Sequence, residues 1–327
     1  MPPANSHARN SHHALAPALA ALLFACILTL CAQPARTAEA SQASTTADLV
    51  NALAEELTDS FVFPEVGQRY AAAIKAKLAN GAYAGISDPD TLAKAITADL
   101  QAVAKDGHLK VFTPAMLAER ALRPNGMPAM NAILASGWLA DGVAYIGFNV
   151  FPGDYATLKT LEEFIAAHAG ARVLIIDART HRGGGLAEMD RMFPQMFARE
   201  TPLVLMDTRE AVERQGGNPI GDSPTVRRQQ APANVVRRLH LAVPAAKPVW
   251  RDTKVILLTS GRTASAAEHL ALSLKRTGRA TLVGETTRGE GIGVAPDVPV
   301  PAAEALNRAL ELAGVDPAKA KKPAGVS

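Results

Sequence analysis

From about residue 136 onward, short apolar runs alternate with segments in which apolar residues recur at helical spacing. The apolar runs predict strands over residues 143–148, 173–177, 203–206, 254–259 and 280–284, and those at 173–177 and 254–259 are expected to be buried. The helical spacing predicts helices over residues 158–167, 185–198, 264–277 and 302–313. Strands that alternate with helices are typical of a layered α/β core. We therefore expect one such core over residues 136–313.

The residues before this core follow a different pattern. Apolar residues recur at helical spacing in three segments, around 49–57, 70–78 and 92–103, which are separated by turn-forming residues. The pattern predicts a small N-terminal helical domain over residues 41–115. Residues 210–247 are polar and basic without a clear period, so we expect a surface loop or insertion there. The Lys- and Pro-rich residues 314–327 are expected to form a disordered tail.

The first forty residues predict an export signal. Residues 14–32 are almost uninterruptedly apolar, and Ala38-Glu39-Ala40 is a small-x-small cleavage site. A membrane anchor is one alternative, because the apolar run is near the lower length limit for spanning a bilayer. Lipidation at Cys31 is another, although the sequence before this cysteine fits a lipidation box poorly. We expect cleavage after Ala40 and an exported protein, periplasmic or secreted, without stable membrane insertion once the signal is removed.

Composition narrows the chemistry that the mature chain can perform. Both cysteines of the 327-residue chain lie in the export signal, which excludes disulfides, a thiolate nucleophile and a cysteine metal site from the rest. The formal net charge of +3 falls to about +2 without the signal, and so small an excess argues against a nucleic-acid partner. No G-x-G-x-x-G fingerprint, P-loop or metal-ligand cluster occurs, so we expect neither a cofactor nor a metal.

Residues 259–268 carry the most informative candidate chemistry. They follow a predicted buried strand and begin a predicted helix, and Ser265 lies at the junction. A serine in this position is partly exposed at the positive end of a helix dipole, which suits chemistry that develops negative charge. The sequence Ser265-Ala266-Ala267-Glu268 also fits a capping box, in which the serine only satisfies free amides at the start of the helix. The sequence allows both interpretations.

A serine nucleophile needs a base, and histidine is the usual one. Five histidines follow the export signal: His108, His168, His181, His240 and His269. We expect His168 and His240 at the surface. His269 follows Ser265 by one helical turn, where its orientation suits proton transfer poorly. His108 lies on an Asp-Gly turn, as either a base or a solvated turn residue.

Three consecutive glycines, Gly183, Gly184 and Gly185, follow the predicted strand at 173–177. Glycine lets the backbone adopt positive φ and approach a ligand closely, so amides here could supply half of an oxyanion hole. A flexible strand-to-helix turn is the alternative.

Five motifs occur in chain order and together resemble the C-terminal processing (tail-specific) serine peptidase family. They are Asp106-Gly107-His108-Leu109, Tyr145-Ile146-Gly147-Phe148, Asp177-x-Arg179-x-x-x-Gly183-Gly184, Thr263-Ala264-Ser265-Ala266-Ala267-Glu268 and Gly284-Glu285-Thr286-Thr287-Arg288-Gly289. The resemblance is to the tricorn-core and interphotoreceptor retinoid-binding-protein branch, and it covers nearly all of residues 46–313. The chain leaves no room for the PDZ domain that the processing proteases usually carry.

The resemblance implies a ClpP/crotonase-like α/β fold and hydrolysis of peptide bonds in a peptide or protein substrate, without a cofactor. Ser265 matches the nucleophile of the family and His108 matches the general base of its histidine-using branch. The amides of Gly184 (or Gly183) and Ala266 match the oxyanion hole. In the histidine-using branch a glutamate completes the site, and Glu290-Gly291-Ile292-Gly293-Val294-Ala295-Pro296-Asp297 matches its motif.

The chain also departs from the family. Glu290 stands at the spacing where other processing proteases carry a lysine base, so a Ser–Lys dyad is not expected. Glu290 follows Gly289 directly, whereas relatives place a further stretch of chain between these two motifs. A chain shortened at this point would have weaker activity. Gly107 and His181 replace a serine and an asparagine that are common in relatives. A catalytically weak module that binds hydrophobic ligands or peptide tails is therefore the alternative function, and an acyl-CoA enzyme rests on fold analogy alone.

Overall fold

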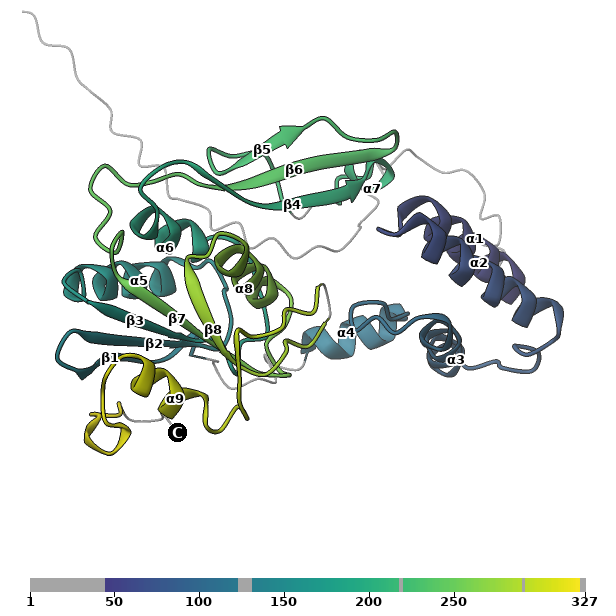
Figure 1. The fold of residues 1–327 in the computed structure, drawn as a ribbon. Helices are drawn as coiled ribbons and strands as arrows, with labels where there is room; N and C mark the ends of the chain where they lie inside the picture. Colours follow the sequence, from purple (N-terminus) through teal and green to yellow (C-terminus); the bar gives the residue numbers. More distant parts are fainter. Residues whose placement is uncertain (1–44, 123–130, 218–219, 290–291, 324–327) are drawn as a thin grey trace, which may run out of the picture. The chain divides into compact units, whose positions relative to one another are not determined.

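The computed structural model describes residues 45–122, 131–217, 220–289 and 292–323 (Figure 1). The export signal predicted over residues 1–40 lies outside the described residues, and so does Glu290. Among the helices that are described, none is both long enough and apolar enough to cross a membrane.

The helices predicted for the N-terminal part are confirmed as α1 (Thr46–Ser60), α2 (Pro64–Ala79) and α3 (Pro89–Val103). The first turns of these helices are stabilised locally: Thr45 and Asp88 each accept a backbone amide, and prolines begin α2 and α3. One cluster of buried residues joins the three helices and the segment between α2 and α3: Val50, Ala54, Leu57, Tyr70, Ala71, Ile74, Tyr83, Leu92, Ile96 and Leu100. The sequence pattern does not predict the short helix α4 (Pro114–Leu122) that follows.

A six-stranded sheet forms the centre of the remaining chain. Its strands are, in spatial order, β1 (Ile133–Ala140), β2 (Val143–Phe148), β3 (Val173–Asp177), β7 (Lys254–Thr259), β8 (Ala280–Gly284) and β9 (Val298–Pro299). β2, β3, β7, β8 and β9 pair with their neighbours in parallel, and β1 pairs antiparallel with β2. The sequence does not predict β1, because most of its residues are only partly buried, as is usual for an edge strand.

Alternate residues of the parallel strands point to opposite faces of this sheet, and both faces are covered. On one face, Ile146, Ile176 and Leu257 share a cluster with α5 (Tyr155–Ala167), α6 (Met189–Met196) and α8 (Ala266–Arg276). On the other face, Tyr145, Ile175 and Leu258 share a cluster with α9 (Ala305–Leu312). Figure 1 shows the sheet between these two helical layers, which confirms the layered α/β core predicted from the sequence.

Of the two forms expected for residues 210–247, a surface loop or an insertion, the irregular loop is wrong, because the segment contains regular structure. β6 (Val235–Ala242) pairs antiparallel with both β4 (Thr201–Arg209) and β5 (Val226–Gln229) in a second sheet. The short helix α7 (Glu210–Arg214) lies between β4 and β5 in the chain. Arg238 is 3% exposed in β6 and pairs with Glu213 and Asp222. A buried, ion-paired arginine interrupts the apolar alternation by which a strand is recognised in a sequence.

The disordered tail expected over residues 314–327 is also wrong as far as residue 323. A 3₁₀ turn, η1 (Pro317–Lys319), is capped by the Asp316 carboxylate, and the Lys321 amide donates to the Leu139 carbonyl at 2.7 Å. Val315 and Ala320 pack against the cluster that contains α9. These few apolar contacts and one backbone hydrogen bond hold the segment, although its Lys- and Pro-rich composition hides them.

Candidate active site

Two loops leave the central sheet at the same edge, because β3 and β7 are parallel neighbours. The loop after β3 contains the three glycines, and the loop after β7 contains Ser265. The Ala264 amide donates to the His181 carbonyl at 3.0 Å, and the Thr263 hydroxyl donates to the Ala178 carbonyl at 2.8 Å. The two sequence motifs therefore form one hydrogen-bonded unit.

Ser265 immediately precedes α8 in an unusual backbone conformation, with φ 56° and ψ −121°. Among the described residues, only one other non-glycine residue, Asn234, has a positive φ. A residue with a Cβ in this region costs of the order of 1–3 kcal/mol and persists only where its surroundings enforce it. Backbone strain of this kind is concentrated at functional sites. The strained conformation therefore distinguishes Ser265 from an ordinary helix cap.

Ser265 and Glu268 also form the capping box that the sequence allows. The Glu268 carboxylate accepts the Ser265 amide at 3.1 Å, and the Glu268 amide faces the serine side chain. The Glu268 amide donates instead to the Ser265 carbonyl at 2.8 Å. The Ser265 hydroxyl makes no side-chain cap hydrogen bond. The box thus leaves the hydroxyl available for other partners.

Glu268 has a further structural role that sequence reasoning missed. It is 2% exposed, and its carboxylate accepts from the Thr287 hydroxyl and the Gly289 amide at 2.7 Å each. Glu268 therefore ties the first turn of α8 to the segment that runs up to Glu290.

The glycine loop passes so close to Ser265 that side chains are excluded from it. Gly183 and Gly184 have φ values of 112° and 127°. A Cβ on Gly183 would lie 2.6 Å from the Ser265 Cβ, and one on Gly184 would lie 2.0 Å from the Phe151 carbonyl oxygen. Real Cβ atoms do not approach so closely, so both positions need glycine.

The amides of this loop differ in what they can offer a ligand. The Gly183 amide donates to His181 Nδ1 at 3.0 Å and is already engaged. Within the described ranges, the amides of Gly184 and Ala266 have no hydrogen-bond partner. Of the backbone donors predicted for an oxyanion hole, these two are the free ones.

His181 supports the glycine loop from within the core. Its ring is fully buried and packs edge-on against Phe151, with ring centroids 4.1 Å apart. Burial lowers the pKa of His181 to about 3. The ring is therefore neutral near pH 7, and a neutral Nδ1 can accept the Gly183 amide.

His108 lies on a turn that Gln101 of α3 holds closed. The Gln101 side chain donates to the Asp106 and Leu109 carbonyls at 2.7 Å each and accepts the Asp106 amide at 2.9 Å. The Asp106 carboxylate accepts the His108 amide at 2.8 Å and lies 3.6 Å from His108 Nδ1. The imidazole itself is 57% exposed.

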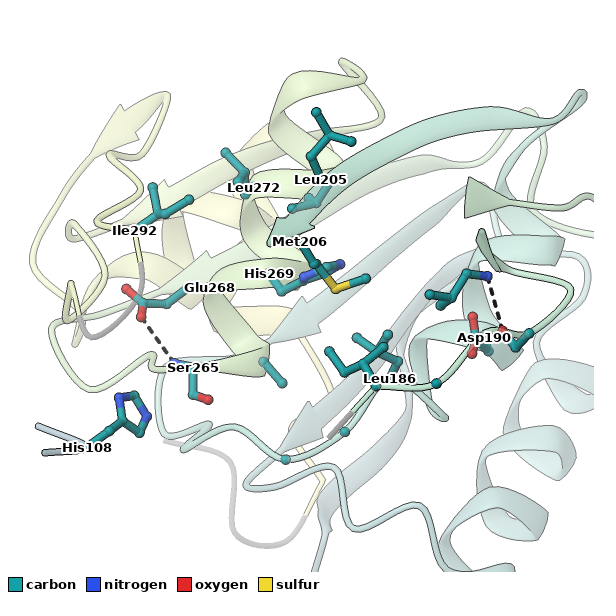
Figure 2. A pocket seen from close by; sticks show the side chains of 18 residues that line it. His108, Leu186, Asp190, Leu205, Met206, Ser265, Glu268, His269, Leu272 and Ile292 are labelled. Carbon is teal, nitrogen blue, oxygen red and sulfur yellow. Dashed lines mark hydrogen bonds between the residues drawn. The ribbon is translucent and has the colours of Figure 1, made fainter. Parts of the chain in front are cut away.

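Ser265, His108 and the free amides of Gly184 and Ala266 line one cavity of about 770 Å³, which we call the Ser265 pocket (Figure 2). Its volume is that of a typical ligand site. Most of its other walls are apolar, formed by Leu186, Val204, Leu205, Met206, Val226, Leu272 and Ile292. Among the described residues, no hydrogen bond joins the Ser265 and His108 side chains, although such bonds are often long in an unliganded site.

Two histidines expected at the surface are buried instead. His168 is 7% exposed, stacks on Phe164 and also contacts Trp138. His240 is fully buried and hydrogen-bonds His269 and Asp190. The arginines before His240 suggested an exposed position, but the ion pairs of Arg238 allow this part of β6 to be buried.

Not every motif residue faces the Ser265 pocket. Asp177 and Arg179 are each less than 10% exposed and form an ion pair at 2.6 Å. Tyr145 donates to Asp177 at 2.8 Å, and burial together with this carboxylate raises the pKa of the Tyr145 hydroxyl. The pair is a structural support of the β3 loop. In the part of the chain that the structure covers, no group of three or more His, Cys, Asp or Glu side chains could hold a metal ion.

Comparison with known families places these observations in context. Residues 142–307 match the model of peptidase family S41. Residues 41–134 match the N-terminal domain of S41 peptidases in the eukaryotic interphotoreceptor retinoid-binding protein. The two matches adjoin, so no PDZ domain separates them.

Two solved structures have a similar fold. A protein from Parabacteroides merdae, proposed to be a peptidase, is 16% identical with a TM-score of 0.52, and the match covers 84% of this chain and 94% of that one. The photosystem II D1 C-terminal processing protease is 14% identical with a TM-score of 0.50, and the match covers 81% of this chain and 97% of that one.

Proposed function

The chain belongs to peptidase family S41, whose members include serine peptidases, and we propose that Ser265 is its nucleophile and His108 its general base. One observation carries the proposal: the Ser265 hydroxyl, the His108 imidazole and two unpaired backbone amides line the same pocket. The strained backbone of Ser265 supports it, since such strain is usually retained for function.

The proposed reaction follows from these positions. His108 takes the Ser265 proton while the serine oxygen attacks the carbonyl carbon of a peptide bond. The carbonyl oxygen becomes an oxyanion that the Gly184 and Ala266 amides hold, each contributing about 3 kcal/mol. His108 then protonates the leaving amine, and the acyl group stays on Ser265. Water, deprotonated by His108, attacks this ester, releases the acid and restores Ser265.

Further residues are proposed to support the base. The Asp106 carboxylate lies 3.6 Å from His108 Nδ1 and can hold the imidazole in one orientation. Glu290 is proposed to complete the site, as its motif in relatives implies. Glu268 supports the role proposed for Glu290, because its carboxylate accepts the amide of Gly289, the residue before Glu290.

We propose that the protein is exported, to a periplasm or the medium, after cleavage of residues 1–40. The mature chain would then comprise the helical domain at 41–115 and the peptidase core at 136–313. Export predicts a mature N-terminus at Ser41, which N-terminal sequencing of the secreted or periplasmic fraction would detect. Full-length protein held in the membrane fraction would contradict it.

The test of catalysis compares Ser265, which immediately precedes α8, with Ser273, which lies within it. Ser265→Ala should lower kcat for casein or peptide hydrolysis by a factor of about 10⁴ or more and abolish labelling by a fluorophosphonate. Ser273 is the matched control, because it is buried in α8 and its hydroxyl has no hydrogen-bond partner among the residues that the structure describes. Ser273→Ala should label and hydrolyse as the parent does. Equal hydrolysis rates in the parent and Ser265→Ala would reject the proposal.

The second candidate function is binding without efficient turnover. The apolar walls of the Ser265 pocket favour it, because they suit hydrophobic ligands or peptide tails. Saturable binding that survives Ser265→Ala, together with no hydrolysis by the parent, would establish this function in place of catalysis.

A further inference from the structure

Three titratable side chains form a hydrogen-bonded chain that the proposed mechanism does not use. Asp190 comes from α6, His240 from β6 and His269 from α8. His240 Nε2 lies 3.1 Å from Asp190 Oδ1, and His240 Nδ1 lies 2.8 Å from His269 Nε2. Asp190 and His269 line the Ser265 pocket, whereas His240 is fully buried. Figure 2 shows His269 on α8, the helix that Ser265 precedes.

The order of donors and acceptors in this chain determines what His269 presents to the pocket. An ionised carboxylate only accepts hydrogen bonds, so His240 Nε2 carries the proton. In a neutral His240 ring Nδ1 is then the acceptor, and His269 Nε2 must donate to it. His269 Nδ1 consequently has a lone pair and no proton.

The His269 ring itself is neutral near pH 7. Burial, with a contribution from neighbouring His240, lowers the pKa of His269 to about 3. His269 Nδ1 also has no hydrogen-bond partner within the described residues. His269 lines the Ser265 pocket together with the apolar side chains of Val204, Met206 and Leu272. An acceptor in such a wall is satisfied only when a bound molecule, or water, donates to it.

We propose that His269 Nδ1 is a specificity-determining acceptor for a substrate side chain that has an apolar body and one donor at its tip. Tyrosine fits this description, because its ring suits the apolar walls and its hydroxyl can donate to the imidazole. Asp190 and His240 are positioning residues that set the tautomer of His269. The inference rests on the proposed function only for the expectation that the ligand is a peptide.

The test measures binding rather than hydrolysis, so that it stands apart from the test of catalysis. Two N-acetylated tetrapeptide amides that differ only in Tyr or Phe at one position are titrated calorimetrically into Ser265→Ala protein. The Tyr peptide should bind about tenfold more tightly, the effect of one hydrogen bond. Adding His269→Phe should bring the ratio of the two affinities to about one.

The ratio, and not either affinity, distinguishes selection from a merely structural role. If the chain only joins α6, β6 and α8, His269→Phe will weaken both peptides alike and leave the ratio unchanged. His168→Phe is the matched control, because it replaces another buried histidine that does not line the Ser265 pocket. It should preserve the tenfold preference. Asp190→Asn, at a partly exposed position, should reduce the preference and carries the test if His269→Phe does not fold.

The remaining outcomes are equally decisive. Equal affinity for the Tyr and Phe peptides, or no saturable binding of either, overturns the inference. Tighter binding of a Lys peptide than of the Tyr peptide also overturns it, because Asp190 would then contact the substrate. A preserved Tyr preference in a protein that hydrolyses nothing would overturn the proposed function and leave this inference standing.

Discussion

The two proposed catalytic side chains are held in very different ways. Ser265 belongs to a loop that hydrogen-bonds to the neighbouring glycine loop, and its strained backbone is fixed by the start of α8. His108 projects from a turn, is 57% exposed, and depends on Gln101 and Asp106 for its position. The core of the protein thus positions the nucleophile, and a surface turn positions the base.

This difference has a consequence for how the site would assemble. The nucleophile and the oxyanion donors must match the transition state closely, and displacements of about 1 Å can cost a hundredfold in rate. A base on a turn can instead adjust when substrate covers it, which agrees with the missing hydrogen bond between His108 and Ser265. We therefore expect substitutions near Ser265 to affect both stability and activity, and substitutions near His108 to affect activity alone.

Removal of the base should give the largest effect of the predictions that follow. His108→Ala should lower kcat by a factor of about 10²–10⁴, the usual contribution of a general base. Because the side chain is exposed, the free energy of unfolding should change by less than about 0.5 kcal/mol. Peptide hydrolysis and urea unfolding measure the two quantities, with Lys110→Ala, at an exposed position nearby, as the control. A variant with parental activity would exclude His108 as the base.

The glycine loop should show the opposite combination, a loss of stability together with activity. Gly184→Ala places a Cβ 2.0 Å from the Phe151 carbonyl oxygen at a φ of 127°, so the backbone must shift. We expect a loss of about 2–3 kcal/mol of unfolding free energy and about a hundredfold in kcat. Gly185→Ala meets no atom within 4 Å and should be close to neutral. Similar results for the two variants would contradict the close packing of this loop.

The buried histidine below the loop should make stability depend on pH. The pKa of His181 is about 3 in the folded protein against 6.5 in the unfolded chain, so the unfolded state binds the proton first as pH falls. Stability from this group is therefore lost between about pH 6.5 and pH 3, by about 2 kcal/mol from pH 7 to pH 5. His181→Asn retains an acceptor for Gly183 but has no proton to gain. Urea unfolding at the two pH values should show a loss smaller by this amount in the variant, and equal losses would contradict the burial argument.

The same contrast explains how much the sequence could predict. The parallel strands and Ser265 are predictable, because continuous apolar runs mark buried strands and the serine begins a capped helix. β6 is not predictable, because Arg238 interrupts its apolar pattern and the ion-pair partners that allow its burial, Glu213 and Asp222, are distant in the sequence. Periodicity says nothing about which distant turn reaches Ser265. The sequence left His108 open as a base or a solvated turn residue, and only the family resemblance favoured the base. Gln101 gave no signal, since its hydrogen bonds serve an irregular turn.

Gln101 allows the most sensitive test of the surface turn, because it does not line the Ser265 pocket. Gln101→Ala removes three hydrogen bonds to the turn that carries His108, and we expect kcat/KM to fall about tenfold through misplacement of the base. Gln101→Glu keeps the acceptor for the Asp106 amide but loses both donors, so its activity should lie between those of Gln101→Ala and the parent. Gln229→Ala, at an exposed position in β5, should leave kcat/KM unchanged. Parental activity in Gln101→Ala would mean that substrate alone orders the turn, and the base would then need no support from α3.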